Sequence, residues 1–172
     1  MNIFFRLLFI FEILFSLNSL FAQEKKNAIV ENYQKLDPRE AVRAILIDKQ
    51  NYKWLGTDKG LYRVISMDSE PELMISDSIS SLAEDKSEMV WFGNRKQQLI
   101  TEDQKQKIIL SDKNLEITCM SYFKGDIWVG TNNGLFKVSD DQNKILNHYT
   151  TDNSKLKSNH INMLYPDKEG KL

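Results

Sequence analysis

The stretch Trp54-Leu55-Gly56-Thr57-Asp58-Lys59-Gly60-Leu61-Tyr62-Arg63-Val64, or WLGTDKGLYRV, occurs again further along the chain. It returns as WVGTNNGLFKV from Trp128 and, in a less regular form, as WFGNRKQQLIT from Trp91. Each tryptophan follows the previous one by 37 residues. A fixed period in this range indicates a fold that is built from repeated units.

The first repeat alternates apolar runs with turn signals, as short β-strands do. It predicts strands at residues 42–47, 53–57, 61–65 and 72–75. Asp48 begins the turn at 48–51, because an Asp side chain can accept a hydrogen bond from a backbone N–H two residues on. Gly60, in the next turn, is free to take a positive φ. Four short antiparallel strands per repeat are typical of one blade of a β-propeller.

The turns differ between the repeats. Gln97 stands where the other two repeats have Gly60 and Gly134. We expect either a Gln at positive φ, at a cost on the order of 1 kcal/mol, or a loop that has re-formed around an extra residue. The second blade should therefore be the least regular. In the third repeat, Lys124-Gly125 suits a two-residue hairpin in which the glycine supplies a positive φ.

The predicted fold class is all-β: a partial β-propeller of four-stranded antiparallel blades, preceded by a signal-peptide helix. We place three blades at about 41–76, 77–113 and 114–150, and the start of a fourth at 158–172. Ten positions that recur between repeats are expected to be structural: Trp54, Gly56, Thr57, Gly60, Trp91, Gly93, Trp128, Gly130, Thr131 and Gly134.

An aspartate also recurs in the repeats. Asp48 and Asp85 each lie six residues before a tryptophan, and Asp167 lies in a similar segment near the end of the chain. The same spacing would place the next tryptophan at residue 173, one beyond Leu172. We therefore expect a chain that stops within a repeat, and an open arc of blades that is unstable or associates when alone.

The first 22 residues, MNIFFRLLFIFEILFSLNSLFA, combine Arg6, a long apolar run and Ala22 before a polar stretch. They predict a secretory signal peptide cut after Ala22, followed by a lead-in segment at 23–40, and hence a periplasmic or otherwise exported protein. A membrane anchor is the alternative, because about 20 apolar residues can span a bilayer. Glu12 within the run disfavours the anchor.

Composition narrows the functional classes. The 23 basic and 24 acidic residues nearly cancel, which gives no basis for nucleic-acid binding. Cys119 is the only cysteine, so an internal disulfide is excluded, and we expect it to be a small core residue. His148 and His160 have no metal-binding spacing. We expect both at the surface, flanking the polar loop 150–157, which is the first place to look for a ligand.

Each motif that suggests chemistry has a structural explanation that we favour. Tryptophans can stack on sugars, but one per repeat at a fixed place indicates packing between blades. The recurring aspartates could form a calcium site, but turn formation explains them better. Glu84 and Asp85 are adjacent on a strand and point to opposite faces, so they cannot form a carboxylate pair. We predict no catalytic, cofactor-binding or metal-binding residues.

The segments WLGTDKGLYRV and WVGTNNGLFKV resemble the two-component regulator propeller repeat, in which an apolar run precedes Asp-x-x-Gly-x-Leu-Trp-Ile-Gly-Thr, two residues and Gly-Leu. The segment LKSNHI at 156–161 resembles the Leu-x-Ser-Asn-x-Ile motif that leads into a blade of that family. The resemblance covers the chain from about Tyr33 to its end. It implies a periplasmic sensor region of a histidine kinase, with further blades, a transmembrane helix and the kinase outside this chain.

We therefore expect a ligand-sensing or interaction module outside the cytoplasm that is not itself an enzyme. Its expected partners are an unknown small molecule or glycan, and the remaining blades and kinase of a longer parent protein. Three alternatives stay open. They are an exported propeller that acts as a carbohydrate-active enzyme, a structural or adhesive propeller without signalling, and the remnant of a broken gene.

Overall fold

The computed structural model describes residues 40–66, 68–110, 114–167, 169 and 172. Within these ranges the chain forms twelve β-strands and no helix, and thus no helix that could cross a membrane. The predicted signal peptide at 1–22 lies outside the described residues, as does the lead-in segment apart from Glu40.

The strands form three separate four-stranded sheets, and every neighbouring pair is antiparallel. The first sheet contains β1 (Val42–Ile47), β2 (Lys53–Thr57), β3 (Leu61–Val64) and β4 (Glu72–Ile75). The second contains β5 (Ile79–Glu84), β6 (Val90–Asn94), β7 (Gln98–Thr101) and β8 (Lys107–Ile109). The third contains β9 (Ile117–Phe123), β10 (Asp126–Thr131), β11 (Gly134–Ser139) and β12 (Lys144–Tyr149). Each sheet is one blade, which confirms the predicted all-β propeller class.

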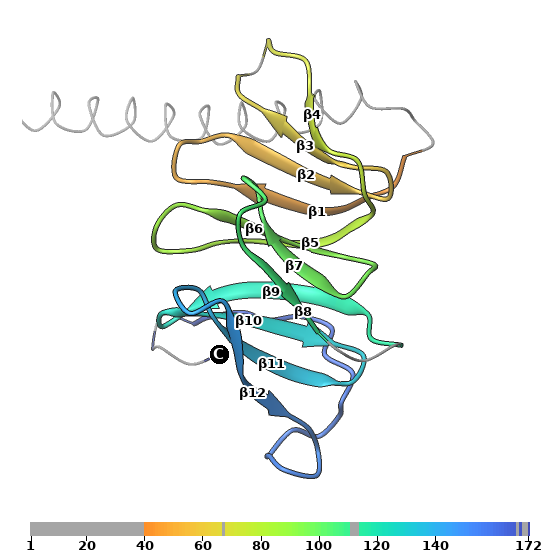
Figure 1. Ribbon diagram of the computed structural model, residues 1–172, viewed down its shortest axis with the longest axis vertical. Helices are drawn as coiled ribbons and strands as arrows, with labels where there is room; N and C mark the ends of the chain where they lie inside the picture. Colours follow the sequence, from red (N-terminus) through yellow and green to blue (C-terminus); the bar gives the residue numbers. More distant parts are fainter. Residues whose placement is uncertain (1–39, 67, 111–113, 168, 170–171) are drawn as a thin grey trace, which may run out of the picture.

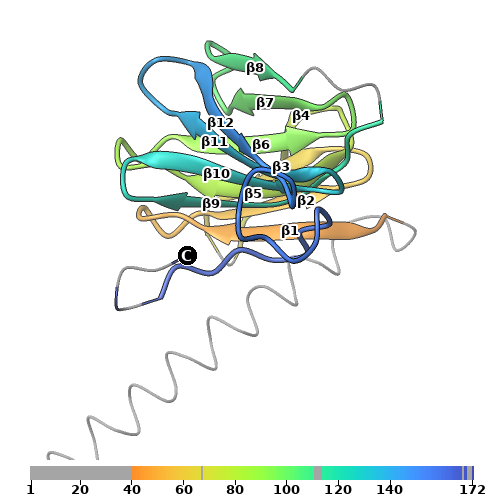
Figure 2. The same cartoon turned by 90° about the horizontal axis from the view of Figure 1, so that it is seen from below.

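The three blades stack against one another in chain order (Figure 1). β5 contacts both β1 and β9, so the first strands of the blades lie side by side. The fourth strands β4 and β8 lie on the opposite side of the molecule (Figure 2). The first strand is therefore the inner strand of each blade, and the fourth is the outer one.

Apolar side chains fill the spaces between the blades. The interface of the first two blades contains Trp54, Leu61, Ile79, Leu82, Val90 and Phe92. The interface of the second and third blades contains a larger cluster that includes Trp91, Leu99, Ile117, Met120, Ile127 and Val129. Full burial of a side chain of this size stabilises a fold by about 1.5–3 kcal/mol. These two clusters hold the arc together.

The turns resolve the alternatives that the sequence left open. In the second blade Gly93 pairs with Leu99, whereas Gly56 pairs with Leu61 and Gly130 with Leu135, so this turn has re-formed around one extra residue, and Gln97 takes a φ of 58° in it. The predicted hairpin at Lys124-Gly125 is confirmed, with φ values of 51° and 88°. The prediction for Gly60 is wrong, because its φ lies outside the left-handed region. A Cβ at Gly60 would instead overlap the side chain of Leu73 on β4, so closeness to the outer strand explains this glycine.

In the segment 158–172, where the sequence predicted the start of a fourth blade, the described residues form no strand. Within the described residues the segment has no strand to pair with, although the N–H of Ile161 donates to the carbonyl of Thr131 at 2.9 Å. Met163 and Tyr165 are 77% and 73% exposed. The start of the fourth blade thus lies against the third blade as a single segment.

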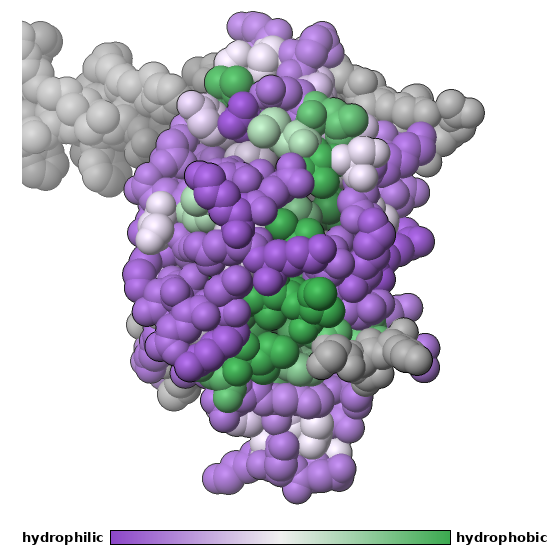
Figure 3. All heavy atoms as spheres, viewed as in Figure 1, coloured by the Kyte–Doolittle hydropathy of each residue, from purple (hydrophilic) through white to green (hydrophobic). Residues whose placement is uncertain are grey.

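The outer side of the molecule is mostly hydrophilic, with its most extensive hydrophobic area around β8, where the second blade meets the third, and smaller areas over the first blade (Figure 3). Ile109 on β8 is 57% exposed. Single exposed apolar residues are common in soluble proteins, so this feature alone does not identify a site.

Candidate functional site

The recurring tryptophans lie on the second strand of each blade, and the recurring aspartates bond to them. Trp54 and Trp91 are 1% and 0% exposed. The indole Nε1 of Trp54 donates to Oδ2 of Asp48 at 2.7 Å, and that of Trp91 donates to Oδ2 of Asp85 at 2.8 Å. The other carboxylate oxygen of Asp48 accepts the N–H of Tyr52 at 2.8 Å, within the turn. Sequence reasoning found the turn but missed the indole bond.

Trp128 has a different environment. The turn before it is one residue shorter and has no aspartate at the place of Asp48 and Asp85, so its Nε1 donates to the carbonyl of Phe123 at 3.3 Å. Its ring stacks on Tyr149, with 5.8 Å between centroids and 14° between planes. Lys137 Nζ lies 5.7 Å from the Trp128 ring centroid. Trp128 is only partly buried, because no complete blade follows it within the described residues.

Three recurring glycines, Gly56, Gly93 and Gly130, mark close contacts between successive blades. A Cβ at Gly56 would lie 2.7 Å from Cγ2 of Ile79 on the next blade. A Cβ at Gly93 would lie 2.9 Å from Cγ2 of Ile117, and one at Gly130 would lie 2.8 Å from Cγ2 of Ile161. Ile161 therefore takes the place on the third blade that inner-strand isoleucines take on the first two.

The threonines of the repeat close the turn between the second and third strands. Thr57 Oγ1 donates to the carbonyl of Gly60 at 2.9 Å, and Thr131 Oγ1 donates to that of Gly134 at 2.7 Å. Both threonines are fully buried. Gly134 has a φ of 104°, a conformation that favours glycine. These residues shape the turns.

The burial of Cys119 and of His148 differs from the sequence-based prediction of a core cysteine and a surface histidine. Cys119 is half-buried beside the segment at Ile161, and burial raises the pKa of its thiol. His148 is partly buried, because its ring stacks on Phe136 with 3.9 Å between centroids. Its Nε2 lies 2.6 Å from the carbonyl oxygen of Asn133. His160 is exposed, as expected.

The loop 150–157 packs on the open face of the third blade. Its residues Ser154, Lys155 and Leu156 join Trp128 and Tyr149 around an apolar hollow of about 340 Å³. Polar ligands need convergent donors and acceptors, and this hollow has few. The sequence had made this loop the first place to look for a ligand, but a more polar cleft lies elsewhere.

A cleft of about 640 Å³ runs across all three blades, where the inner strands begin. Its lining combines β1 and β5, the turn between β6 and β7, and the segment that leads into β9: Arg43, Ser80, Asn94, Arg95, Gln97, Asn114, Leu115, Glu116 and Ile117. Most of these side chains are polar. A volume in this range suits a small molecule.

Two arginines bring positive charge to the cleft. Arg43 and Arg95 are both exposed, and within the described part of the chain neither forms an ion pair. Glu116 is the one acidic residue of the lining. The cleft can thus offer two guanidinium groups, one carboxylate and several amides to a ligand.

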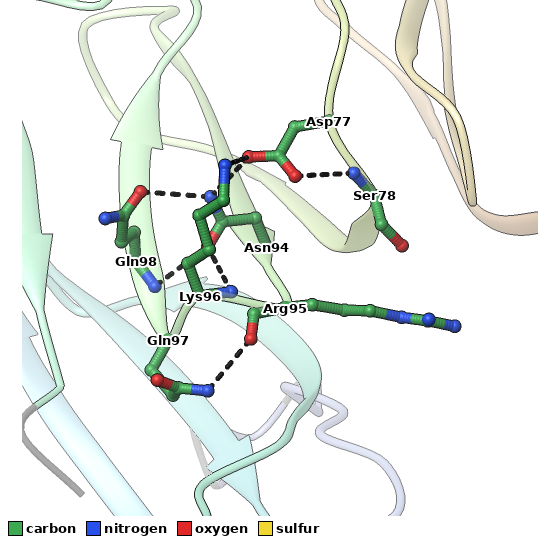
Figure 4. Close-up of polar contacts among 7 residues, drawn as sticks. All are labelled: Asp77, Ser78, Asn94, Arg95, Lys96, Gln97 and Gln98. Carbon is green, nitrogen blue, oxygen red and sulfur yellow. Dashed lines mark hydrogen bonds and ion pairs between the residues drawn. The ribbon is translucent and has the colours of Figure 1, made fainter. Parts of the chain in front are cut away.

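The turn that carries Arg95 is held rigidly by its neighbours (Figure 4). Oδ1 of Asn94 accepts the N–H groups of Lys96 and Gln98, both at 3.0 Å. Nδ2 of Asn94 donates to Asp77 at 3.0 Å, and Lys96 pairs with the same carboxylate at 3.0 Å. The Arg95 side chain extends away from this network (Figure 4).

Neither the adjacent carboxylates Glu84 and Asp85 nor any group of possible metal ligands forms a further site within the described residues. Glu84 accepts the N–H of Lys49 at 3.1 Å, whereas Asp85 bonds to its own turn and to Trp91. The two carboxylates thus serve different neighbours. In the described ranges no group of three or more His, Cys, Asp or Glu residues is placed to hold a metal ion.

No protein-family model and no curated protein matches the chain. Solved structures do. The chain is similar to the extracellular domain assigned to a hybrid two component system of B. thetaiotaomicron, at 26% sequence identity and a TM-score of 0.65. The match covers 79% of this chain and 20% of that one. A second extracellular domain from B. thetaiotaomicron, assigned to a one component system, matches at 25% identity and a TM-score of 0.64 over 78% of this chain and 20% of that one.

Virginiamycin B lyase from Staphylococcus aureus is similar at 15% identity and a TM-score of 0.57, over 66% of this chain and 42% of the lyase. At that identity the likeness shows the fold alone.

The present chain spans about a fifth of the length of the two extracellular domains. The resemblance to two-component propellers that the repeats indicated is thus confirmed in structure, with extracellular domains assigned to hybrid two component and one component systems as neighbours.

Proposed function

We propose that this chain is a ligand-sensing module that acts outside the cytoplasm, as part of the sensor propeller of a longer signalling protein. The observation that carries the proposal is the match of its three blades to extracellular domains assigned to signalling systems. The remaining blades and a kinase would be its partners in that longer protein. A small molecule or glycan would be its ligand.

The cleft at the inner strands supports a binding role. It is polar and large enough for a small molecule, and three blades form it together. A ligand held there would contact several repeats at once, so binding could change the angle between blades. The lyase neighbour does not favour an enzymatic role, because a shared fold does not define chemistry.

The proposal is tested by export and by ligand response. The chain, expressed with a C-terminal tag in a Gram-negative host, is fractionated, and the N-terminus of the tagged protein is read by mass spectrometry. We expect periplasmic protein that begins at Gln23.

Thermal unfolding is then followed with a panel of neutral sugars, acidic sugars and amino acids. At least one class should raise the melting temperature, since a ligand that binds only the folded state stabilises it.

Two results would contradict the proposal. One is a soluble cytoplasmic protein with an intact Met1. The other is a melting temperature that no member of the panel changes. The second result would remove the sensing role even if export were found.

A further inference from the structure

We propose that the cleft binds a small anion that also carries hydroxyl groups, with Arg43 and Arg95 as its charge-recognising residues. The inference rests on the proposed sensing function and names the ligand class of the same site. Arg43 comes from β1 of the first blade, and Arg95 comes from the β6–β7 turn of the second. A bound anion would therefore bridge two blades.

The chemistry of the lining favours this class of ligand. A guanidinium is a planar fork of donors that matches carboxylate, sulfate or phosphate oxygens. Neither arginine is neutralised by an ion pair within the described residues. Glu116 and the amides of Gln97 and Asn114 border the same space, and such groups exchange hydrogen bonds with hydroxyls.

The turn that supplies Arg95 departs from the repeat at the positions that face the cleft. In the regular blades this position holds Asp58 or Asn132. Asp58 Oδ1 accepts the N–H of Ala41 at 3.1 Å, and Asn132 Oδ1 accepts that of Glu116 at 3.0 Å. An arginine cannot accept such a bond.

In the second blade, Asp77 takes over that structural task. Its Oδ1 accepts the N–H of Ser78 at 2.8 Å, and its Oδ2 accepts from Asn94 and Lys96. The Arg95 side chain is therefore not needed as an acceptor in the turn. The turn also holds one residue more than those of the other blades, with Gln97 at a φ of 58°. The second repeat is therefore irregular where the cleft is formed.

The test compares two probes that differ at one ring substituent, which is charged in one and neutral in the other. D-Glucuronate and D-glucose have the same ring hydroxyls, but glucuronate carries a carboxylate in place of the hydroxymethyl group. Binding of each to the full chain is measured by isothermal titration calorimetry, with citrate and inorganic sulfate as further anions. We expect glucuronate or citrate, which carry hydroxyl groups, to bind more tightly than sulfate, which carries none. D-Glucose should bind much more weakly than glucuronate.

Arginine variants locate the binding. Arg43→Gln and Arg95→Gln should each lower the affinity for the anion by roughly tenfold to a hundredfold, as expected for loss of a hydrogen bond to a charged group. Lys144→Gln removes the same charge from β12, the outer strand of the third blade, which does not line the cleft. It should leave the affinity for the anion unchanged. All three side chains are exposed, so the fold should be retained, and circular dichroism checks this.

The inference fails if none of the three anions binds, or if both arginine variants bind as the unaltered protein does. Binding of a neutral sugar that neither arginine affects would overturn the inference but leave the sensing role intact. Equal weakening by Lys144→Gln would indicate only non-specific attraction, and would also overturn it. Failure of every neutral and charged ligand would remove the proposed function as well.

Discussion

At the scale of single residues, Asp85 has two roles. One carboxylate oxygen accepts two N–H groups of its turn, from Ser87 and Met89, at 2.8 and 3.1 Å. The other accepts the indole N–H of Trp91. The aspartate thus ties the turn to the tryptophan that packs between blades. Asp85 is buried, so its removal would leave the indole N–H and the turn N–H groups without an acceptor. A buried donor without a partner destabilises the fold.

Asp85→Ala should therefore lower the free energy of unfolding by about 1–3 kcal/mol. Asp85→Asn keeps an acceptor oxygen and should cost less. Urea denaturation followed by circular dichroism measures both. The control is Asp152→Ala, on the exposed loop, which should change stability little. A loss at Asp85 no larger than at Asp152 would contradict the role given to the indole bond.

Asp103 allows a pH prediction. Thr101 Oγ1 donates to Asp103 Oδ1 at 2.7 Å, Lys105 N donates to it at 3.1 Å, and Lys105 Nζ lies 3.1 Å from Oδ2. These partners, the Thr101 hydroxyl first, lower the pKa of Asp103 from 3.8 to about 2. Because the folded pKa is below the unfolded one, the stabilisation is present above pH 3.8 and is lost as pH falls through about 2.

In Thr101→Val, which removes the hydroxyl but keeps a side chain of similar size, the pKa of Asp103 should rise toward its ordinary value. NMR titration of the side-chain carboxyl carbon measures the change. Lys105→Gln removes only the ion pair and should raise this pKa less. An unchanged pKa in Thr101→Val would refute the assignment of the hydroxyl as the main cause.

At the scale of elements, the turn at 94–97 is the clearest departure from the repeat. Gln97 holds a left-handed backbone that favours glycine, and Gln97→Gly should stabilise the fold by up to about 1 kcal/mol. The gain is reduced because glycine also gives the unfolded chain more freedom. Thermal unfolding measures it, and Gln98→Gly on β7 is a control that should destabilise. A loss of stability in Gln97→Gly would show that the turn is not strained.

The strands of the first blade could be predicted from sequence to within a residue, because turn residues separate its short apolar runs. The indole bond could have been inferred from the constant spacing of Asp48 and Asp85 to their tryptophans. Gly60 was misjudged because its contact with Leu73 depends on how β4 pairs with β3, and the sequence predicted the strand at 72–75 but not this contact. The cleft could not be predicted, because three blades supply its lining and those positions do not repeat. Its sequence signal was a turn in which Asn94, Arg95 and Gln97 all depart from the pattern of the other two repeats.

At the scale of the whole molecule, the two ends of the arc are not equivalent to its middle. Leu61 and Leu99 are fully buried, whereas Leu135, at the same place in the third blade, is partly exposed. Trp128 differs from Trp54 and Trp91 in the same way. The face that would meet a further blade is therefore apolar and open.

We expect this open face to make the chain associate. Size-exclusion chromatography with light scattering should find oligomers whose proportion rises with concentration, since exposed apolar faces favour association. The double variant Met163→Ser, Tyr165→Ser should reduce their proportion. Ile109→Ser removes an exposed apolar residue from β8, on another blade, and should not reduce it. A monodisperse monomer at all concentrations would rule out association through this face.

The contacts of Gly56, Gly93 and Gly130 with an isoleucine of the following segment have a geometric consequence. Each contact sets how closely one blade approaches the next, and so acts as a spacer that determines the wedge angle between them. The contacts act in series, so a small error in each angle accumulates around the arc. An added methyl group at one glycine would therefore alter the curvature of the whole assembly, and with it the number of blades that could complete a circle.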